Sequence, residues 1–451
     1  MHLRSKQLLL AASSAAVTAL LAWALLGDRL VVEASTVELD DNTEGFAALL
    51  RSRQRSAPAA ASDAPALPSA FAEPAAETVP RPAPEISAEV FAEALRRPHL
   101  EPTGRGLATI PAAPRVSPED PPPLVREPIS EELARETFYR ALREQGPYRF
   151  QPLAHLWAKP SFEFTRPFPE HPAGAWHYRT NALGFLKDVE VMDPAPAMRI
   201  VVSGDSHTAG VVPNSESFAN VLEQRLRADG DPDQVEVLNA GVGGTSMYHY
   251  LGVLEYTAEL VHPAVFVVCL YGGNDFSGVM ALNRFYNRSP PPAFGPHGGR
   301  RLKQLSATGV VGQAVAQVAY FLDNPDDVAR SLEAVKSITV EMERLCREQG
   351  IELVFVYLPS AVAAQPERFA EQLDTALEVL AIERDDLAIT DELAAQWMEF
   401  LGRRGLTCID MTPILGASDE ACYWTTDLHL NTHGHGLVAE ALERVIAPLR
   451  R

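Results

Sequence analysis

Short apolar runs alternate with amphipathic helical patterns over residues 198–451, and this alternation constrains the fold more than any other feature. The apolar runs lie at 200–202, 235–238, 264–270, 351–358 and 406–409. Apolar residues then recur every three or four positions, as amphipathic helices require, at 247–260, 327–349, 391–403 and 433–448. Strands joined by helices predict an α/β fold with a central parallel five-stranded sheet and right-handed crossovers.

Two stretches interrupt this alternation. Residues 276–326 contain three consecutive prolines at 290–292 and many glycines, and residues 360–386 show no strand pattern. Long insertions near strand ends often form lids or substrate walls. We therefore expect one α/β domain over 198–451 with non-regular insertions at about 276–326 and 360–386.

The first 30 residues predict a membrane anchor. Arg4 and Lys6 precede a stretch at 8–26 whose residues are apolar or small, apart from two serines and one threonine. This stretch is long enough to cross a bilayer as a helix. The basic flank places the N-terminus in the cytoplasm and the rest of the chain on the outer, periplasmic or extracytoplasmic side. A cleaved signal peptide, which would give a secreted protein, is the alternative interpretation.

Residues 31–129 predict a disordered linker. Between 57 and 128 the chain consists largely of alanine, proline and acidic residues, a composition that buries too little apolar surface to offset chain entropy. One short helix is expected inside it at 87–97, with Ser87 as its N-cap. Residues 130–197 then form an N-terminal extension that we expect to pack on the α/β domain.

This extension contains two recognisable patterns. Residues 130–145 predict a helix with Ser130 as its N-cap and apolar residues along one face. The aromatic-rich residues 176–185 predict an edge strand or a packed loop.

Charge and cysteine usage exclude several classes of function. The formal net charge is -20 with a pI near 5.1, which argues against a nucleic-acid partner. None of the cysteines forms a CxxC pair, so neither a structural zinc site nor a thioredoxin-like site is indicated. Cys408 and Cys422 can pair if the compartment is oxidising.

Polar and glycine-containing motifs stand at the ends of the predicted strands and before the last helix. They are Gly204-Asp205-Ser206, Asn239 to Gly244, Gly272-Gly273-Asn274-Asp275, and Asp427 with His429. Parallel strands bring their carboxyl ends to one sheet edge, where open α/β sheets bind ligands. Acyl transfer needs a nucleophile, a base and a group that orients the base, which Ser206, His429 and Asp427 can supply. The Gly244 backbone and the Asn274 amide can donate hydrogen bonds to an oxyanion.

Each of these motifs also has an ordinary structural explanation. Glycines after a strand usually form turns, Asn274 suits a turn or a cap, and His429 suits a structural role. The joint pattern favours catalysis, because all four groups fall at the same edge of one predicted sheet.

At these residues the sequence resembles the SGNH, or GDSL, hydrolase family over about 200–449. The resemblance implies a flavodoxin-like three-layer sandwich and ester hydrolysis without a cofactor. It also implies that the backbone N–H groups of Ser206 and Gly244 form the oxyanion hole together with the Asn274 amide. One feature departs from many members, in which the acid stands three residues before the histidine. Here Thr426 occupies that position and Asp427 stands two residues before His429.

These observations predict a membrane-tethered serine esterase of the cell envelope. Its substrate would be a small-molecule or glycan O-acyl ester, with an acetyl group on a glycan as one candidate. An O-acyltransferase that uses the same site and a sugar acceptor is the alternative. A metal-binding protein using Asp427, His429, His433 and His435, or a non-catalytic envelope protein, is a weaker one. The sequence leaves the oligomeric state open.

Overall fold

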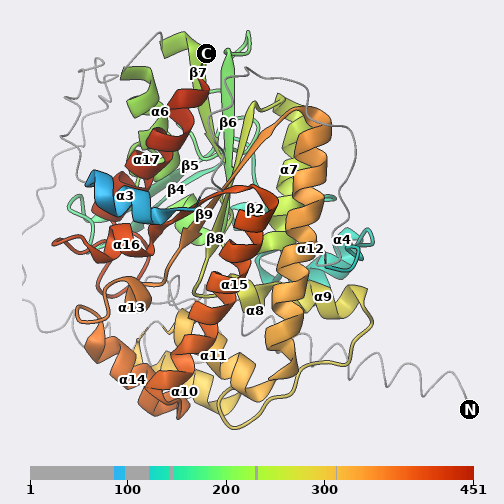
Figure 1. Cartoon of the computed structure of the whole chain (residues 1–451), viewed down its shortest axis with the longest axis vertical. Coiled ribbons are helices and arrows are strands. Elements are labelled where there is room, and N and C mark those ends of the chain that lie inside the picture. The colour runs from blue at the N-terminus through green and yellow to red at the C-terminus, as the bar shows by residue number, and fades with distance from the viewer. Residues whose placement is uncertain (1–85, 97–120, 143–145, 229–231, 311, 451) are drawn as a thin grey trace, which may run out of the picture.

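The computed structural model describes residues 86–96, 121–142, 146–228, 232–310 and 312–450 (Figure 1). The predicted anchor at 8–26 and most of the predicted linker therefore lie outside the described residues. Within the described ranges, every helix is too short or too polar to cross a membrane.

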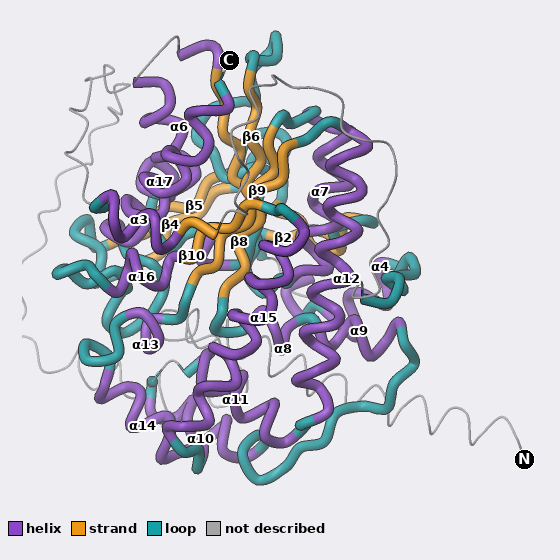
Figure 2. The backbone as a smooth tube through the Cα atoms, viewed as in Figure 1, coloured by secondary structure: helices purple, strands orange, loops and turns teal. Residues whose placement is uncertain are grey.

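Five parallel strands form the centre of the molecule (Figure 2), as the sequence predicts. They are β6 (Met198–Ser203), β7 (Val235–Asn239), β8 (Val265–Tyr271), β9 (Glu352–Leu358) and β10 (Thr407–Asp410). Their spatial order is β7-β6-β8-β9-β10, with partners such as Val201↔Phe266 and Cys269↔Val356 in register. This is the strand order of flavodoxin, and the order reverses beside β6, where such sheets bind their ligands. The strands are almost entirely buried, because helices cover both faces.

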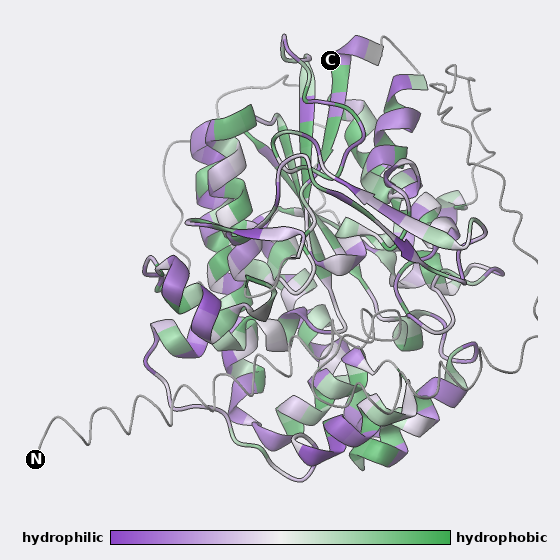
Figure 3. Cartoon of the chain, turned by 180° about the vertical axis from the view of Figure 1, so that it is seen from behind, coloured by the Kyte–Doolittle hydropathy of each residue, from purple (hydrophilic) through white to green (hydrophobic). Residues whose placement is uncertain are grey.

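Helices form an outer layer on each side of the sheet. One face packs against α7 (Met247–Val261), α12 (Asp326–Gln349) and α15 (Ala388–Arg404). The other packs against α6 (Phe218–Ala228), α16 (Met411–Gly416) and α17 (Thr432–Ile446). Figure 3 shows apolar residues along the central strands and polar residues on the outward sides of many helices. The predicted three-layer arrangement is therefore present.

A short segment of the predicted linker belongs to the fold. Ser87 caps α3 (Ala88–Ala94) by accepting a hydrogen bond from the Val90 N–H, as predicted. The chain then pairs as β1 (Leu95–Arg96) antiparallel to β10, with Leu95 opposite Ile409. The sequence predicts a helix over 87–97 within the linker, but the helix ends at Ala94 and residues 95–96 form a strand instead. The reason is that the parallel sheet leaves the backbone of β10 open at its edge, and β1 satisfies it.

Both predicted non-regular insertions are in fact largely helical. The first contains α8 (Asp275–Gly278), α9 (Met280–Tyr286), α10 (Arg300–Thr308) and α11 (Gln313–Asp323), and the second contains α13 (Ala361–Ala364) and α14 (Ala370–Leu380). The proline triplet at 290–292 occupies only the loop between α9 and α10. The prolines therefore lie outside both helices and do not interrupt either one. Helices α10, α11 and α14 gather at one end of the molecule (Figure 1).

The extension at 130–197 consists of one broken helix and two hairpins. Ser130 caps α4 (Glu131–Leu133), as predicted, but a π-helical turn (Ala134–Phe138) and a 3₁₀ turn (Arg140–Leu142) replace the rest of the expected helix. The hairpins are β2 (Tyr148–Gln151) with β3 (His155–Ala158), and β4 (Glu163–Pro167) with β5 (Ala175–Arg179). Trp157 of β3 is completely buried, and its Nε1 donates to the Leu183 carbonyl at 3.0 Å. β5 covers only the start of the aromatic segment 176–185 and pairs outside the central sheet.

Candidate active site

Ser206 stands directly beyond the carboxyl end of β6. Asp205 caps the short helix α5 (Ser206–Ala209), because its Oδ1 accepts the His207 N–H at 2.8 Å. A Cβ on Gly204 would lie 2.0 Å from Thr208 Oγ1 and 3.0 Å from the Cys269 carbonyl oxygen, so only glycine fits there. This turn holds the Ser206 hydroxyl at the sheet edge, where the strand order reverses.

Ser206, His429 and Asp427 form one hydrogen-bonded chain. Ser206 Oγ and His429 Nε2 are 2.8 Å apart, and His429 Nδ1 and Asp427 Oδ1 are 2.6 Å apart. His429 and Asp427 are buried, with 1% and 4% of their surfaces exposed. The carboxylate fixes the proton on Nδ1, which leaves Nε2 free to accept the Ser206 proton. The structure thus brings together the three residues predicted to act as nucleophile, base and orienting acid.

A strained turn allows the acid to stand two residues before the base. Leu428 adopts φ +61°, which is unfavourable for a residue with a branched side chain. The turn folds Asp427 back so that its Oδ1 also accepts the His429 N–H at 3.2 Å. On the other side, the Trp424 N–H donates to the His429 carbonyl at 2.8 Å. The unusual spacing therefore still gives a direct contact between acid and base.

The β4–β5 hairpin supports this turn from outside the α/β domain. Glu170, in the loop of the hairpin, accepts the backbone N–H of Thr426 at 3.0 Å and that of Asp427 at 3.2 Å. Phe168 of the same loop packs edge-on against Trp424, with ring centroids 5.3 Å apart. Sequence patterns do not reveal these contacts, because the residues are more than 250 positions apart in the chain.

Two buried ionisable groups flank the nucleophile. His207 stacks between Tyr271, at 3.7 Å between centroids, and His429, at 4.3 Å. Burial lowers the pKa of His207 well below its usual value, so its ring is neutral. Burial also raises the pKa of Asp205 to about 6, although nearby His429 and hydrogen bonds act in the opposite direction.

Gly244 lies in the turn that follows β7. Backbone hydrogen bonds hold this turn against the turn that contains Ser206. One of them runs from the Val242 N–H to the Gly204 carbonyl at 3.0 Å. Gly244 has φ +74°, a conformation that favours glycine. A Cβ on Gly243 would lie 3.6 Å from Ser206 Cβ, so this turn passes directly beside the nucleophile. Tyr148 of the extension accepts the Gly243 N–H at 3.2 Å.

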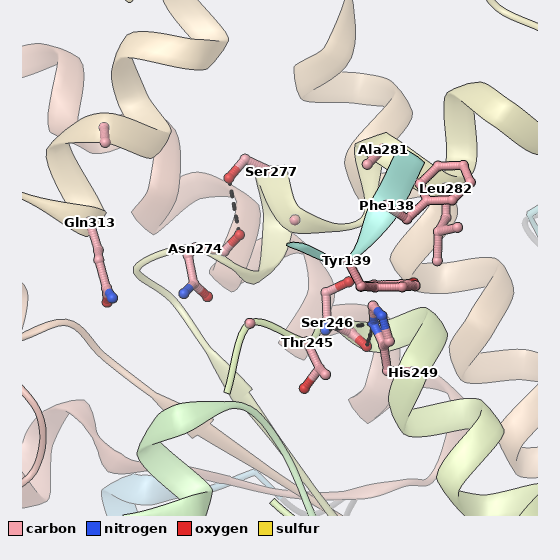
Figure 4. Close-up of a pocket in the computed structure, with 13 residues that line it drawn as sticks. Phe138, Tyr139, Thr245, Ser246, His249, Asn274, Ser277, Ala281, Leu282 and Gln313 are labelled. Carbon is pink, nitrogen blue, oxygen red and sulfur yellow. Dashed lines mark hydrogen bonds between the residues drawn. The ribbon is translucent and has the colours of Figure 1, made fainter. Parts of the chain in front are cut away.

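Asn274 and its neighbour Asp275 have different surroundings. Asp275 is fully buried and accepts the Tyr271 N–H at 2.8 Å and the Tyr250 hydroxyl at 3.0 Å, which makes it a structural residue. Asn274 lines a pocket, and its Oδ1 is buried without a hydrogen-bond partner among the described residues. Figure 4 shows Asn274 on one side of this pocket, where the Ser277 hydroxyl donates to the backbone carbonyl of Asn274 at 3.0 Å.

This pocket adjoins two of the predicted oxyanion donors and has a cavity volume of about 50 Å³. Its lining comes from the extension, the start of α7 and the insertion helices. It comprises Phe138, Tyr139, Gly244, Thr245, Ser246, His249, Asn274, Ser277, Gly278, Ala281, Leu282, Gln313 and Ala316. Phe138, Tyr139 and His249 carry no recognisable sequence signal for a role at a site.

The histidines of the metal-binding alternative point to different partners. His429 contacts Ser206 and Asp427, His433 Nε2 contacts Ser418 Oγ at 2.9 Å, and His435 Nδ1 accepts the Phe218 N–H at 3.1 Å. Across the described residues, no three His, Cys, Asp or Glu side chains are arranged to hold a metal ion. Cys408 and Cys422 are both buried and do not form a disulfide.

A protein-family model matches the part of the chain that contains this site. Residues 202–437, slightly more than half of the chain, match the model of the GDSL-like lipase/acylhydrolase family. No curated protein matches the sequence.

Similar solved structures include three esterases or lipolytic proteins. A putative lipolytic protein of the G-D-S-L family from Desulfitobacterium hafniense is 14% identical with a TM-score of 0.33, covering 55% of this chain and 99% of its own. The acetyl xylan esterase AlAXEase is 17% identical with a TM-score of 0.30, covering 55% and 100%. A catalytic mutant of an acetylxylan esterase from Geobacillus stearothermophilus is 9% identical with a TM-score of 0.34, covering 56% and 96%.

Proposed function

Because the family model matches more than half of its length, the chain belongs to the GDSL-like lipase/acylhydrolase family, and from this premise we propose a membrane-tethered esterase that cleaves a short O-acyl ester. As a member of this family, it is a serine hydrolase that acts on ester bonds. The observation that carries the proposal is the continuous contact from Ser206 through His429 to Asp427, at 2.8 and 2.6 Å.

The geometry supports the following reaction. Ser206 Oγ bonds to the acyl carbon while its proton passes to His429 Nε2, and Asp427 stabilises the imidazolium. The developing oxyanion accepts hydrogen bonds from the Ser206 and Gly244 N–H groups and from the Asn274 amide. The bond to the alcohol then breaks, and the alcohol leaves with the proton from His429. Water repeats these steps on the acyl-serine and releases the acid.

A short-chain ester assay tests this function. Ser206→Ala should abolish turnover while the circular dichroism spectrum and the melting temperature stay unchanged, because the variant removes only the covalent route. Wild-type turnover in the variant would remove Ser206 as the nucleophile. Adding an acceptor glycan, such as a deacetylated polysaccharide, separates hydrolysis from transfer: a transferase would form an O-acylated glycan in preference to free acid.

We also propose that the catalytic domain lies outside the cytoplasmic membrane, because a basic flank precedes the apolar stretch at 8–26. A C-terminal fusion to a reporter that is active only outside the cytoplasm should be active. Activity of a cytoplasm-only reporter at the same position would contradict this topology.

A further inference from the structure

A buried hydrogen-bond donor without an acceptor lies in the wall of the pocket. His249 is 4% exposed, and its Nδ1 lies 3.0 Å from the Ser246 N–H, closer than to the Ser246 carbonyl at 3.2 Å. The shorter of these two contacts, with the Ser246 N–H, requires an acceptor at Nδ1, so we assign the proton to Nε2. Nε2 is buried and has no hydrogen-bond partner among the described residues. Buried donors are rarely left unpaired, so we expect a bound molecule to supply an acceptor for Nε2–H.

The pocket offers this acceptor an uncharged environment. Its lining contains no lysine or arginine, and burial lowers the pKa of His249 to about 3, so the imidazole stays neutral. A carboxylate would find no countercharge in the lining, and Arg126, whose charge acts on His249 from outside it, is paired with Glu255. Phe138, Ala281 and Leu282 form an apolar wall on the side of Tyr139 and His249, across the pocket from Asn274 and Gln313 (Figure 4). The chemistry of the pocket therefore fits a small group with an uncharged oxygen.

The position of the pocket identifies which part of the ester enters it. Gly244 and Asn274, two of the proposed oxyanion donors, belong to its lining, whereas Ser206 and His429 do not. His429 must give its proton to the leaving alcohol, so the alcohol lies on the His429 side. The group on the other side of the carbonyl carbon is the acyl chain. The cavity volume of about 50 Å³ admits only a few non-hydrogen atoms.

We propose that this pocket is the acyl subsite, and that His249 selects a short acyl chain that carries its own uncharged oxygen, as in an alkoxyacyl or hydroxyacyl ester. The inference rests on the proposed esterase function and specifies the substrate class of the same site. Its central contact is a hydrogen bond from His249 Nε2–H to the chain oxygen. A purely alkyl chain of the same length would leave this donor unpaired.

A matched pair of substrates tests the contact. The 4-nitrophenyl esters of methoxyacetate and butyrate have acyl chains of equal length that differ only by an ether oxygen in place of a methylene. Each kcat/KM is divided by the rate constant for hydroxide-catalysed hydrolysis of the same ester, which corrects for intrinsic reactivity. The wild-type enzyme should prefer the methoxyacetyl ester about tenfold, the factor expected when a buried donor gains its acceptor.

Two variants assign the preference to His249. His249→Phe keeps a flat ring without the N–H, and His249→Asn keeps an acceptor for the Ser246 N–H without any group at the Nε2 position. Either variant should bring the corrected ratio close to one. Tyr139→Phe is the matched control, because it removes only the hydroxyl that contacts His155 Nδ1 at 3.3 Å and leaves His249 in place. Both rates can change in this variant, but their corrected ratio should stay at the wild-type value.

The outcomes separate this inference from the proposed function. If the wild-type enzyme hydrolyses both esters with a corrected ratio near one, a water satisfies His249 or the donor is irrelevant, and the inference is wrong. A preference that survives in His249→Phe and His249→Asn also overturns it. If wild-type turnover of both esters does not exceed that of Ser206→Ala, the esterase proposal itself fails, and the inference fails with it.

Discussion

The residues proposed to act on the two sides of the site differ in how completely their own polar atoms are paired. On the proton-transfer side, Ser206, His429 and Asp427 already form a continuous hydrogen-bonded chain. On the acyl side, Asn274 Oδ1 and His249 Nε2 are buried without partners among the described residues. The difference indicates that the proposed proton-transfer chain is organised before substrate arrives, whereas the His249 donor lacks an acceptor, which the proposed acyl chain would supply.

If the proton-transfer side is pre-organised, changing its acid should have the largest effect. Asp427→Asn keeps the side-chain shape but presents an N–H or a weaker acceptor to His429 Nδ1, which disturbs the tautomer. We expect kcat for a short-chain ester to fall about 10⁴-fold, the effect of the same change in serine proteases. Steady-state kinetics on folded protein measure it. A loss below tenfold would mean that another group orients His429.

The acyl side should be sensitive to a single donor. Asn274→Ala should lower kcat by about 100- to 1000-fold with little change in KM, because an oxyanion donor acts mainly in the transition state. Asn274→Asp should be as damaging or worse, since a carboxylate repels the developing charge. If Asn274 were only a turn residue, both variants would lower the melting temperature and leave kcat unchanged, so both quantities are measured.

The ionisation of Asp205, which directly precedes Ser206, should make the stability of the protein depend on pH. Burial raises its pKa in the folded protein to about 6, above the unfolded value of about 3.9. Its contribution to stability is therefore fully present below about pH 4 and is lost as the pH rises through 6.

Asp205→Asn has no carboxyl group to ionise. Its free energy of unfolding relative to wild type should therefore rise between pH 4 and 7.5, by up to roughly 3 kcal/mol. Urea unfolding of both proteins at the two pH values measures the change. A difference that does not vary with pH would show that Asp205 titrates normally.

The smallest expected effect concerns the support of the acid by the hairpin. Glu170→Ala removes the acceptor of the Thr426 and Asp427 N–H groups. Because this contact is partly exposed, we expect only about a fivefold loss in kcat with unchanged KM. Glu170→Gln retains one oxygen acceptor and should recover most of the activity. Equal losses in the two variants, or a loss confined to KM, would argue against a positioning role.

The parts of the fold that the sequence predicts correctly carry strong local signals. The central strands are continuous apolar runs, such as 264–270, because both faces are covered. The motif residues stand at strand ends, so the topology brings Ser206 and Asn274 to one edge. By contrast, β1 (Leu95–Arg96) has only two residues, and the existing edge of β10 decides its pairing. No periodicity can reveal so short a strand.

The contacts that complete the site depend on long-range packing. Glu170, Tyr148 and Tyr139 reach the site from the extension, and nothing in their local sequence distinguishes them from surface or core residues. The state of His249 likewise follows from its contact with the Ser246 N–H and from burial by distant segments. The sequence predicts the chemical groups of the triad, whereas the groups that shape the acyl pocket emerge only from the folded structure.

The central claim is that Ser206 is an activated nucleophile within a completed triad. Covalent labelling with a serine-directed fluorophosphonate, followed by mass spectrometry of the intact protein and its peptides, tests this claim most directly. The account predicts a single adduct on Ser206, which is lost in Ser206→Ala and slowed by competing ester. An unlabelled Ser206 in folded wild-type protein, or an adduct on another residue while esterase activity disappears, would contradict it.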